Sequence, residues 1–359
     1  MTSSSFNNID YVHVIPSLEI GGAETMLIKI SEMERKKHLV LYFKDGPLKK
    51  ELSSKMIQSI KLNGLFHLIK LLKSQLKRKI VIGWLYKSCI YLALAKLILR
   101  DIKIFFNHRN TLNYENTKKI FRKFTLILLK FITPIANGVL YNSFKGQSTY
   151  HALNIRSANE KVIQNGFNIN DMKAKTLHDN SLKEQLSLNG EECVYLVSAR
   201  NSPEKRINEI IFSFLNAFEK NEKVSLIICG SGTEKLKENF RDERIRIMGQ
   251  VDNIHDYYQV SDYLVLFSTT EGFPNVVGEA MFWGLPCIVS NVGDCSMLVK
   301  NSGWICESSS SVELSDKFKI SKTITSHEYN QRSKKASELI VNKYDMENVY
   351  KKFLNFVKN

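Results

Sequence analysis

Short apolar segments typical of buried β-strands alternate with helical segments along this chain, and the alternation occurs twice. In the first half, the strand candidates are Tyr11–Pro16, His38–Phe43, Ile80–Trp84, Ile102–Asn107 and Gly138–Tyr141. In the second half, they are Cys193–Ser198, Val224–Cys229, Tyr263–Phe267 and Pro286–Ser290. Helical patterns lie between them, notably at Gly21–Met33, 85–100 and 117–131. Because such alternation forms parallel sheets covered by helices, the sequence predicts an α/β fold with two doubly wound domains.

The length of the chain supports this division, since 359 residues exceed the size of one ordinary domain. We expect a first domain over residues 1–168 and a second over 169–345, with the polar stretch Asn168–Glu191 as linker and lead-in. The last segment, Met346–Val357, has the amphipathic pattern of a helix. No run of about 18 apolar residues occurs, so no transmembrane helix is expected. The N-terminus lacks the pattern of a signal peptide.

Charge is unevenly distributed within a net balance of +15. Residues 1–180 carry 29 Lys and Arg against 12 Asp and Glu, whereas residues 181–359 carry 22 against 24. The basic first half predicts contact with an anionic surface. The six cysteines form no CxxC pair, which is typical of reduced cysteines in a cytosolic protein. The eight histidines show no metal-ligand spacing, so no metal is expected.

The segment Glu271–Glu279 places two carboxylates eight positions apart, directly after a strand candidate. Pro274 opens a helical pattern between them. A strand, a turn and a helix in this order bring Glu271 to the carboxyl edge of a parallel sheet, where ligands bind. Asn275 and Glu279 share one helix face. The N–H groups at the helix start, around Val276, offer an anion site.

A basic pair, Arg200 and Lys205, follows the strand candidate Cys193–Ser198. An arginine can hold two phosphate oxygens, and a lysine adds a point charge. Taken alone, such a cluster is best interpreted as a solvated loop. Its position at the end of a strand, in the same domain as Glu271, favours a pyrophosphate site instead.

Two glycine-rich turns also follow strand candidates. Gly21 and Gly22 open the first helix, and they either make a tight turn or let a ligand approach the backbone. They do not form G-x-G-x-x-G, which argues against a dinucleotide site. The second turn, Cys229–Gly232, either touches a nucleotide or is a plain turn, and the plain turn is the better interpretation.

A polar stretch, Phe106–Asn110, ends another strand candidate of the first half. His108 there either hydrogen-bonds a substrate or a departing group, or is a capped loop histidine; both alternatives stay open. Asn165 and Gly166 are typical of a turn near a hinge.

Two segments of the first half, Leu65–Ile82 and Lys118–Phe131, mix basic with apolar residues. Either segment alone is best interpreted as a core helix with a lysine-rich outer face. Together with the basic first half, they favour contact with an anionic membrane surface. Since no aromatic RNA-reading motif or zinc module is present, no nucleic acid partner is expected. The oligomeric state stays open.

These features together resemble the retaining glycosyltransferases of family 4, which have the GT-B fold of two Rossmann-like domains facing each other across a cleft. The resemblance spans the chain and is strongest over residues 194–295. It rests on the Glu271…Glu279 pair, the Arg200…Lys205 pair and the Gly21-Gly22 loop, and on Gly249–Val251, Tyr257-Tyr258, Ser261-Asp262 and Gly284–Pro286. The family often has Gly-Gly-Glu where this chain has Val292–Cys295, a variant that resembles a subset associated with bacterial surface polysaccharides.

The resemblance implies roles for residues of the second domain. Glu279 is expected to bind the donor's ribose, and Glu271 to contact the transferred sugar. Arg200 and Lys205 are expected to neutralise the diphosphate. The donor-binding set is completed by Phe273, Pro274, Asn275 and Val276.

The same resemblance implies roles for the first domain. Gly22, with Gly21, is expected to let the loop approach the diphosphate, and His108 or Arg109 is expected near the sugar. The C-terminal helix, residues 346–359, is expected to pack back on the first domain.

The activity implied is metal-independent transfer, with retention, from a nucleoside diphosphate sugar with uridine as the expected base. The acceptor implied is a polyprenyl-diphosphate-linked glycan in O-antigen, capsule or exopolysaccharide synthesis. We expect a cytoplasmic protein at the inner face of the plasma membrane, with no cofactor. Three alternatives are a GT-B nucleotide-sugar epimerase, a Rossmann oxidoreductase and a non-catalytic basic protein that docks on membrane or nucleic acid.

Overall fold

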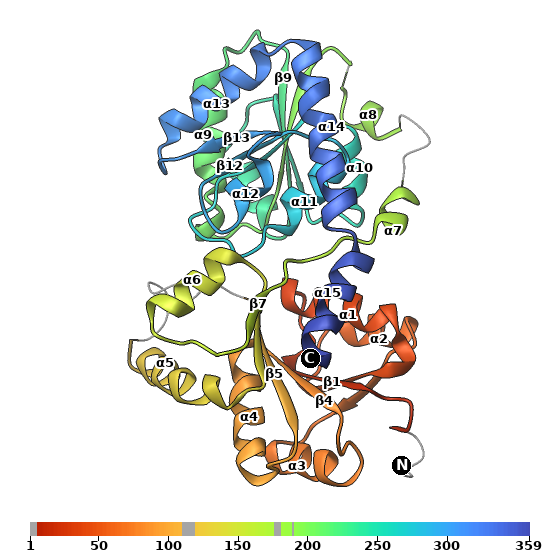
Figure 1. Cartoon of the computed structure of the whole chain (residues 1–359). Helices are drawn as coiled ribbons and strands as arrows, with labels where there is room; N and C mark the ends of the chain where they lie inside the picture. The colour runs from red at the N-terminus through yellow and green to blue at the C-terminus, as the bar shows by residue number, and fades with distance from the viewer. Residues whose placement is uncertain (1–5, 110–118, 176–180, 189) are drawn as a thin grey trace. The chain divides into compact units, whose positions relative to one another are not determined.

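The chain folds into two compact units that are each built around one parallel sheet (Figure 1). The computed structural model describes residues 6–109, 119–175, 181–188 and 190–359. Asn110, Lys118 and parts of the expected linker lie outside these ranges. The first unit comprises Met1–Gly166 and Met346–Asn359, and the second comprises Phe167–Asp345. The boundary therefore falls two residues before the predicted position, because Phe167 already pairs with the second unit through its N–H and the Tyr344 carbonyl.

The first unit contains a seven-stranded parallel sheet in the order β3-β2-β1-β4-β5-β6-β7. Neighbouring strands all run parallel, as expected where helices connect consecutive strands. The strands are β1 (Tyr11–Ser17), β2 (His38–Lys44), β3 (Gln58–Lys61), β4 (Ile80–Trp84), β5 (Lys103–His108), β6 (Gly138–Tyr141) and β7 (Glu160–Val162).

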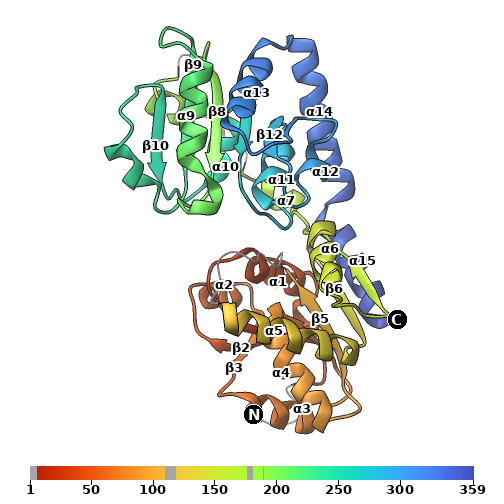
Figure 2. The same cartoon turned by 90° about the vertical axis from the view of Figure 1, so that its left-hand side faces the viewer.

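Helices cover both faces of this sheet. One face packs against α1 (Gly22–Met33), α2 (Leu48–Ser54) and the C-terminal α15 (Met346–Lys358). The other face packs against α3 (Leu65–Ser74), α4 (Leu85–Ile98), α5 (Lys119–Ile132) and α6 (Phe144–Ala152). Figure 2 shows α3, α4 and α5 together on this second face. In the part of the chain that the structure describes, no helix combines the length and the apolar character needed to cross a bilayer.

The second unit contains a six-stranded parallel sheet in the order β10-β9-β8-β11-β12-β13. Its strands are β8 (Cys193–Ser198), β9 (Val224–Cys229), β10 (Ile245–Gly249), β11 (Tyr263–Leu266), β12 (Cys287–Ser290) and β13 (Trp304–Cys306). Both Rossmann-like sheets agree with the predicted fold class.

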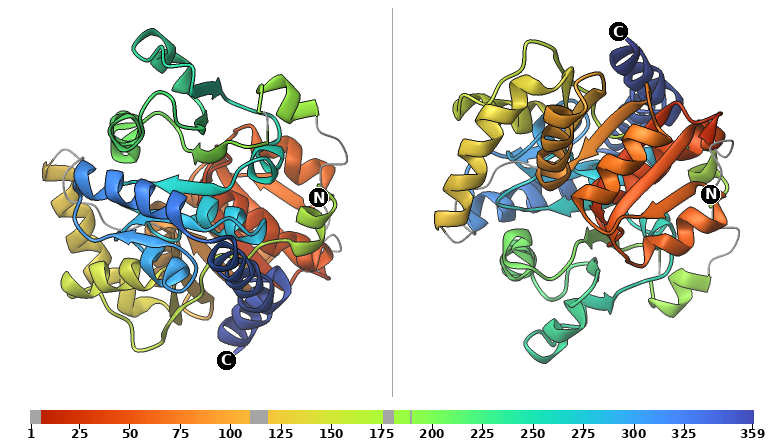
Figure 3. Two further views of the ribbon diagram at one scale, coloured as in Figure 1. Left: turned by 90° about the horizontal axis from the view of Figure 1, so that it is seen from above. Right: turned by 90° about the horizontal axis from the view of Figure 1, so that it is seen from below.

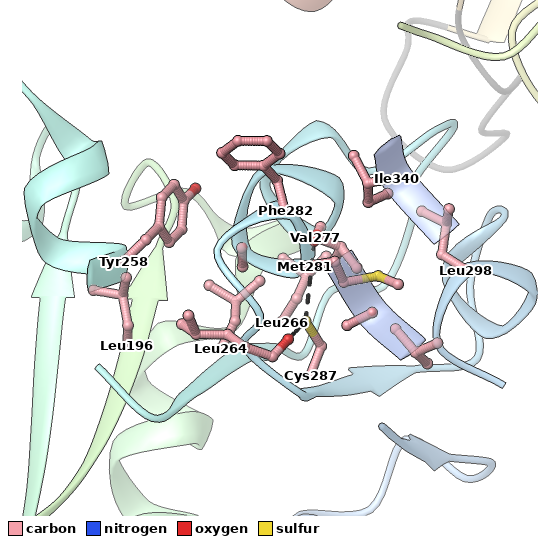
Figure 4. Close-up of a cluster of buried hydrophobic side chains, with 14 of the residues drawn as sticks. Leu196, Tyr258, Leu264, Leu266, Val277, Met281, Phe282, Cys287, Leu298 and Ile340 are labelled. Carbon is pink, nitrogen blue, oxygen red and sulfur yellow. Dashed lines mark hydrogen bonds between the residues drawn. The ribbon is translucent and has the colours of Figure 1, made fainter. Parts of the chain in front are cut away.

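The helices of the second unit also cover both faces of its sheet. One face carries α9 (Ile207–Ala217) and α13 (Ser311–Thr323). The other carries α10 (Ile254–Gln259), α11 (Asn275–Phe282), α12 (Cys295–Val299) and α14 (Ser326–Lys343). Figure 4 shows how Val277 and Met281 of α11 insert between the strands and α14, with Cys287 donating to the Val277 carbonyl. Two short helices, α7 (Ile169–Lys173) and α8 (Ser181–Gln185), precede the sheet.

The four strands that the sequence pattern did not predict are β3, β7, β10 and β13. All four are edge strands of the two sheets. An edge strand has one sheet neighbour and is less buried, so it does not need a continuous apolar run. The residues of β3 and β7, for example, are all partly or fully exposed.

A chain of hydrogen bonds, buried as far as Tyr350, connects α15 to the first sheet. Trp84 donates its Nε1–H to His13 Nδ1 at 3.0 Å, so His13 carries its proton on Nε2 and donates to His38 Nδ1 at 2.8 Å. His38 then donates from Nε2 to the Tyr350 hydroxyl, which donates to the Glu34 carboxylate; both distances are 2.8 Å. The return of α15 to the first unit thus depends on a polar network as well as on apolar packing.

Candidate functional site

Lys205 and Glu271 form an ion pair at the carboxyl edge of the second sheet. The two residues follow β8 and β11, which are neighbouring strands, so their carboxyl ends lie side by side. Lys205 Nζ donates to Glu271 Oε1 at 2.5 Å. Their side chains are 18% and 13% exposed, so the pair is largely enclosed but still in contact with solvent. The structure therefore brings together two residues that the sequence placed in one site.

The loop that carries Lys205 is held by the residues on either side of it. The Glu204 carbonyl accepts a hydrogen bond from Thr269 N–H at 2.9 Å, which joins this loop to the one after β11. Arg206 adopts a left-handed backbone with φ of 50°. Its guanidinium lies 4.2 Å from the centre of the Phe267 ring and bonds the Glu209 carboxylate. These contacts fix the direction in which Lys205 leaves the backbone.

Arg200 lies on the exposed side of the same edge, supported by the glycine-rich turn after β9. A Cβ on Gly230 would lie 1.9 Å from the Ala199 carbonyl oxygen, so only glycine allows the two backbones this close. Asn201 continues the contact, with its N–H bonding the Ser231 carbonyl at 2.9 Å. The turn 229–232 is thus a structural support for Arg200.

A second glycine turn, around Gly293, supports Glu271. A Cβ on Gly293 would lie 2.5 Å from the Gly272 carbonyl oxygen and 2.7 Å from that of Glu271. Asp294 N–H bonds the Gly272 carbonyl at 3.0 Å. Gly293 also has φ of 57°, a conformation that glycine adopts without strain. The variant turn Val292–Cys295 therefore holds the backbone that carries Glu271.

Glu279 lies one turn from the end of α11, oriented by a tyrosine from α10. The buried Tyr258 hydroxyl donates to Glu279 Oε2 at 3.2 Å. Burial, and the nearby Glu279 charge, raise the pKa of Tyr258 well above its usual value, so the hydroxyl stays a donor. Asn275 and Val276 begin the helix at the sheet edge, after Pro274 as N-cap.

The side chain of Phe273 packs inside the second unit. Its ring is 6% exposed and lies between Phe167 and Tyr344, at 6.2 and 5.5 Å between ring centres. Phe167 also fills the space beside Gly278, where a Cβ would lie 2.1 Å from its ring. Of the predicted donor-binding set, Phe273 thus has its side chain in the core of the second unit.

In the first unit, Gly21 and Gly22 lie after β1, at the start of α1. The N-cap is Gly21, and a Cβ there would lie 2.5 Å from the Glu24 carboxylate. Glu24 is buried, and burial raises the pKa of its carboxyl group. A Cβ at Gly21 would thus have to displace the end of the Glu24 side chain.

His108 lies in the core of the first unit. Its ring is fully buried, stacks on Tyr150 at 4.4 Å, and has no hydrogen-bond partner among the described residues. Burial lowers the pKa of His108 to about 3. A proton-transfer role is therefore disfavoured, because such a group needs a pKa near neutrality and contact with the reacting atoms. The expectation that His108 contacts a departing group is not supported by this placement.

Arg109, the alternative to His108, is also buried but forms hydrogen bonds with neighbouring side chains. Its Nε donates to Asn107 Oδ1 at 2.9 Å and its Nη1 to Asn165 Oδ1 at 2.5 Å. The guanidinium lies 5.0 Å from the centre of the Trp84 ring. Burial lowers the pKa of Arg109 to about 9, so it remains a cation at neutral pH.

Sequence reasoning missed the supporting residues Arg206, Tyr258 and Gly293 as parts of the site. Arg206 adjoins the predicted Lys205, but no sequence signal indicates a left-handed arginine. Tyr258 belongs to the Tyr257-Tyr258 pair noted in the sequence, but only its hydrogen bond to Glu279 shows its supporting role. Within the described ranges, no group of three or more His, Cys, Asp and Glu residues is arranged to hold a metal ion.

The second unit matches a family model. Residues 192–320 match the model described as glycosyl transferases group 1. This range contains Arg200, Lys205, Glu271 and Glu279.

Individual relatives extend the comparison. The chain is 31% identical over 157 residues to the O-antigen biosynthesis glycosyltransferase WbnH of Escherichia coli, covering 42% of this chain and 44% of that protein. It is 32% identical over 152 residues to the E. coli UDP-Gal:alpha-D-GlcNAc-diphosphoundecaprenol alpha-1,3-galactosyltransferase, covering 39% and 38%. The matches thus span less than half the length of these relatives.

The fold matches along nearly the whole chain. The structure of HepE from Anabaena in complex with UDP superposes with a TM-score of 0.86 at 21% identity, covering 98% of this chain and 100% of HepE. The same protein in complex with UDP-glucose gives a TM-score of 0.83 at 20% identity, with 97% and 99% covered. The two Rossmann-like units thus form the GT-B fold.

Proposed function

We propose that this chain, whose second unit matches the model of group 1 glycosyl transferases, transfers a sugar from a UDP-sugar to a glycan acceptor in bacterial O-antigen or related polysaccharide synthesis. The observation that carries the proposal is the Lys205–Glu271 pair at the carboxyl edge of the second sheet, beside the start of α11. The choice of UDP follows the UDP complexes of HepE. The choice of pathway follows the relatives named above.

In this proposal, positive charge stabilises the diphosphate that departs. Arg200, Lys205 and the N–H groups at the start of α11 supply that charge and those donors. Removing one preorganised partner of this kind typically raises the barrier by about 3–4 kcal/mol. Because fixed cations and N–H groups perform this task, we propose that the transfer needs no metal ion or other cofactor.

The two carboxylates have different tasks. Glu279, held by Tyr258, binds the ribose hydroxyls of the donor, and Glu271 orients the sugar and supports it electrostatically. Retention follows if the acceptor attacks from the side of the leaving group, with a diphosphate oxygen taking the acceptor's proton. Gly21 and Gly22 of the first unit have no side chain, and in this proposal they allow the diphosphate to approach the backbone.

The acceptor proposed is a polyprenyl-diphosphate-linked glycan. One relative carries such an acceptor in its name, and the basic first half of the chain suits an anionic membrane that contains lipid-linked substrates. The protein would then act on the cytoplasmic face of the plasma membrane, as a peripheral protein.

A donor screen tests the proposal. Purified protein is incubated with single UDP-sugars and with membrane extract as the source of acceptor, and released UDP is measured. We expect release that depends on both components, with one preferred sugar. Consumption of the donor without extract, with formation of an epimerised sugar nucleotide, would instead identify an epimerase. The absence of both reactions and of UDP binding would contradict the proposal.

Glu271→Gln separates binding from turnover in the same assay. It keeps the shape of the side chain but removes its charge, so turnover should fall while UDP affinity changes little. The matched control is Glu222→Gln. Glu222 also pairs with a lysine of the second unit, Lys322 at 2.5 Å, but it precedes β9 and so lies at the opposite edge of the sheet. Unchanged turnover in Glu271→Gln would remove its proposed role.

A further inference from the structure

Large apolar side chains are exposed on the outer side of α5 in the first unit. Phe124, Ile127 and Phe131 are 67%, 56% and 70% exposed. Their spacing of three and four residues places them on one stripe of the helix. The opposite side of α5, with Leu129 and Ile132, is buried in the core of the unit. The helix therefore has two apolar faces, of which the fold covers one.

The neighbouring helices continue this exposed surface. In α4, Leu94, Leu97 and Ile98 are 41%, 64% and 63% exposed and share one face. In α3, Phe66 is 87% exposed, and it is followed at helical spacing by the exposed Lys70 and Lys73.

The three helices form one contiguous surface. All three cover the same face of the first sheet, and α4 packs against both α3 and α5. Figures 2 and 3 show them side by side, in orange to gold. The exposed stripes thus belong to one surface, which we call the α3–α5 surface: Phe66, Leu94, Leu97, Ile98, Phe124, Ile127 and Phe131.

Basic residues accompany the α3–α5 surface. Residues 65–103, which include α3 and α4, contain nine Lys and Arg and one acidic residue, Asp101. The described exposed ones include Lys70, Lys73, Lys77 and Arg100, and Lys130 of α5 lies beside Phe131. A surface with apolar side chains among cations suits a layer of anionic lipid, where rings and aliphatic chains enter the headgroup region and cations contact phosphates.

We propose that the α3–α5 surface docks on an anionic lipid bilayer, lying on it without crossing it. The biological role of this docking rests on the proposed function. A lipid-linked acceptor lies in a membrane, so docking would bring the enzyme to its acceptor. A second copy of the chain is a less suitable occupant, since a symmetric contact would bring two basic surfaces together.

Vesicle binding tests the inference. Full-length protein is mixed with vesicles of phosphatidylglycerol and phosphatidylcholine, or of phosphatidylcholine alone, and co-sedimentation is measured. We expect binding to the anionic vesicles that weakens as the salt concentration rises, because salt screens the attraction between the lysines and the lipid phosphates. Equal binding to both vesicle types, or none, would overturn the proposal.

Substitutions locate the contact. Ile127→Asp with Phe131→Asp should weaken vesicle binding roughly tenfold or more, through loss of buried apolar area. Lys70→Glu with Lys73→Glu should weaken it by at least roughly fivefold per lysine. The control is Phe212→Asp, an equally exposed apolar position, at 54%, on α9 of the second unit. If the control and the α5 variant lose binding equally, the surface is wrongly assigned.

Two further measurements separate the possible outcomes. UDP affinity without lipid should be the same in the α5 variant and in the unsubstituted protein, and a cooperative urea transition of the first unit shows that the variant folds. Vesicle binding without any UDP affinity would leave this inference intact and reject the proposed function. Light scattering that shows a dimer dissolved by the α5 substitutions would assign the surface to a second copy instead.

Discussion

Lys205 Nζ lies 2.5 Å from Glu271 Oε1, so two groups predicted to face different parts of one donor neutralise each other in the structure. Both side chains are largely enclosed, which makes an unpaired charge costly at either position. A bound diphosphate next to Lys205 would offer it a second anionic partner. The pair thus fixes the position of the Glu271 carboxylate relative to Lys205.

Lys205→Ala should reduce both donor affinity and turnover. The substitution removes a cation from the proposed diphosphate site and leaves the Glu271 carboxylate without this partner. We expect kcat/KM to fall by roughly 10²–10³. Steady-state kinetics with the preferred UDP-sugar measure this effect, and Lys322→Ala serves as the control at the opposite sheet edge. Kinetics equal to those of the control would remove Lys205 from the site.

Gly293→Ala should destabilise the protein more than Gly190→Ala does. Both glycines have positive φ, of 57° and 80°, so each alanine carries a backbone cost of about 1–2 kcal/mol. Only the Cβ at Gly293 would meet backbone, at Glu271 and Gly272, whereas among the described residues beyond the chain neighbours no atom lies within 4 Å at Gly190. The urea midpoint of the second unit measures the difference. Equal urea midpoints for the two variants would show that the turn around Gly293 adapts to the added Cβ and does not fix the backbone of Glu271.

Tyr258→Phe should weaken UDP binding. The change removes one hydrogen bond to the Glu279 carboxylate, and bonds to charged groups contribute about 1.5–3 kcal/mol. If Glu279 binds ribose only when oriented, affinity for UDP should fall by a factor of roughly ten, as calorimetry would show. Tyr257→Phe tests the neighbouring hydroxyl. A loss of the same size in both variants would point to general destabilisation of α10.

Acid should destabilise the first unit through its buried histidine pair. Burial lowers the pKa of His38 to about 4 and that of His13 well below its usual value. An unfolded chain takes up these protons near pH 6.5, whereas the folded chain stays neutral, so the unfolded state binds more protons between these values. The stabilisation is therefore complete above about pH 6.5 and is lost as the pH falls towards 4.

The size of this acid effect can be isolated for His38. His38→Gln cannot titrate, so it should lose less stability than the unsubstituted protein between pH 7 and pH 5. Urea unfolding at the two pH values measures both. Because His108 is present in both proteins, the difference belongs to His38 together with its coupling to the neighbouring His13. An equal loss in both proteins would show that His38 is not the source.

The interior strands of both sheets were predictable because they are buried on two faces. Val12 and Val14 of β1, like Leu264 and Leu266 of β11, are almost fully enclosed, and this enclosure demands the apolar runs that indicate strands. The edge strands β3 and β7 are less buried and therefore do not require an apolar run. Their residues, Gln58–Lys61 and Glu160–Val162, are recognisable as strands only from the pairing with β2 and β6.

The amino-acid sequence by itself determined the α/β class, the two sheets and the segments that follow their strands, because these depend on local apolar patterns. The sequence also identified Lys205 and Glu271, by motif. Only the tertiary structure decided that these residues, 66 positions apart, pair with each other, since this depends on β8 lying beside β11. It also decided that His108 stacks on Tyr150 inside the core, because side-chain direction at a strand end depends on the packing around it.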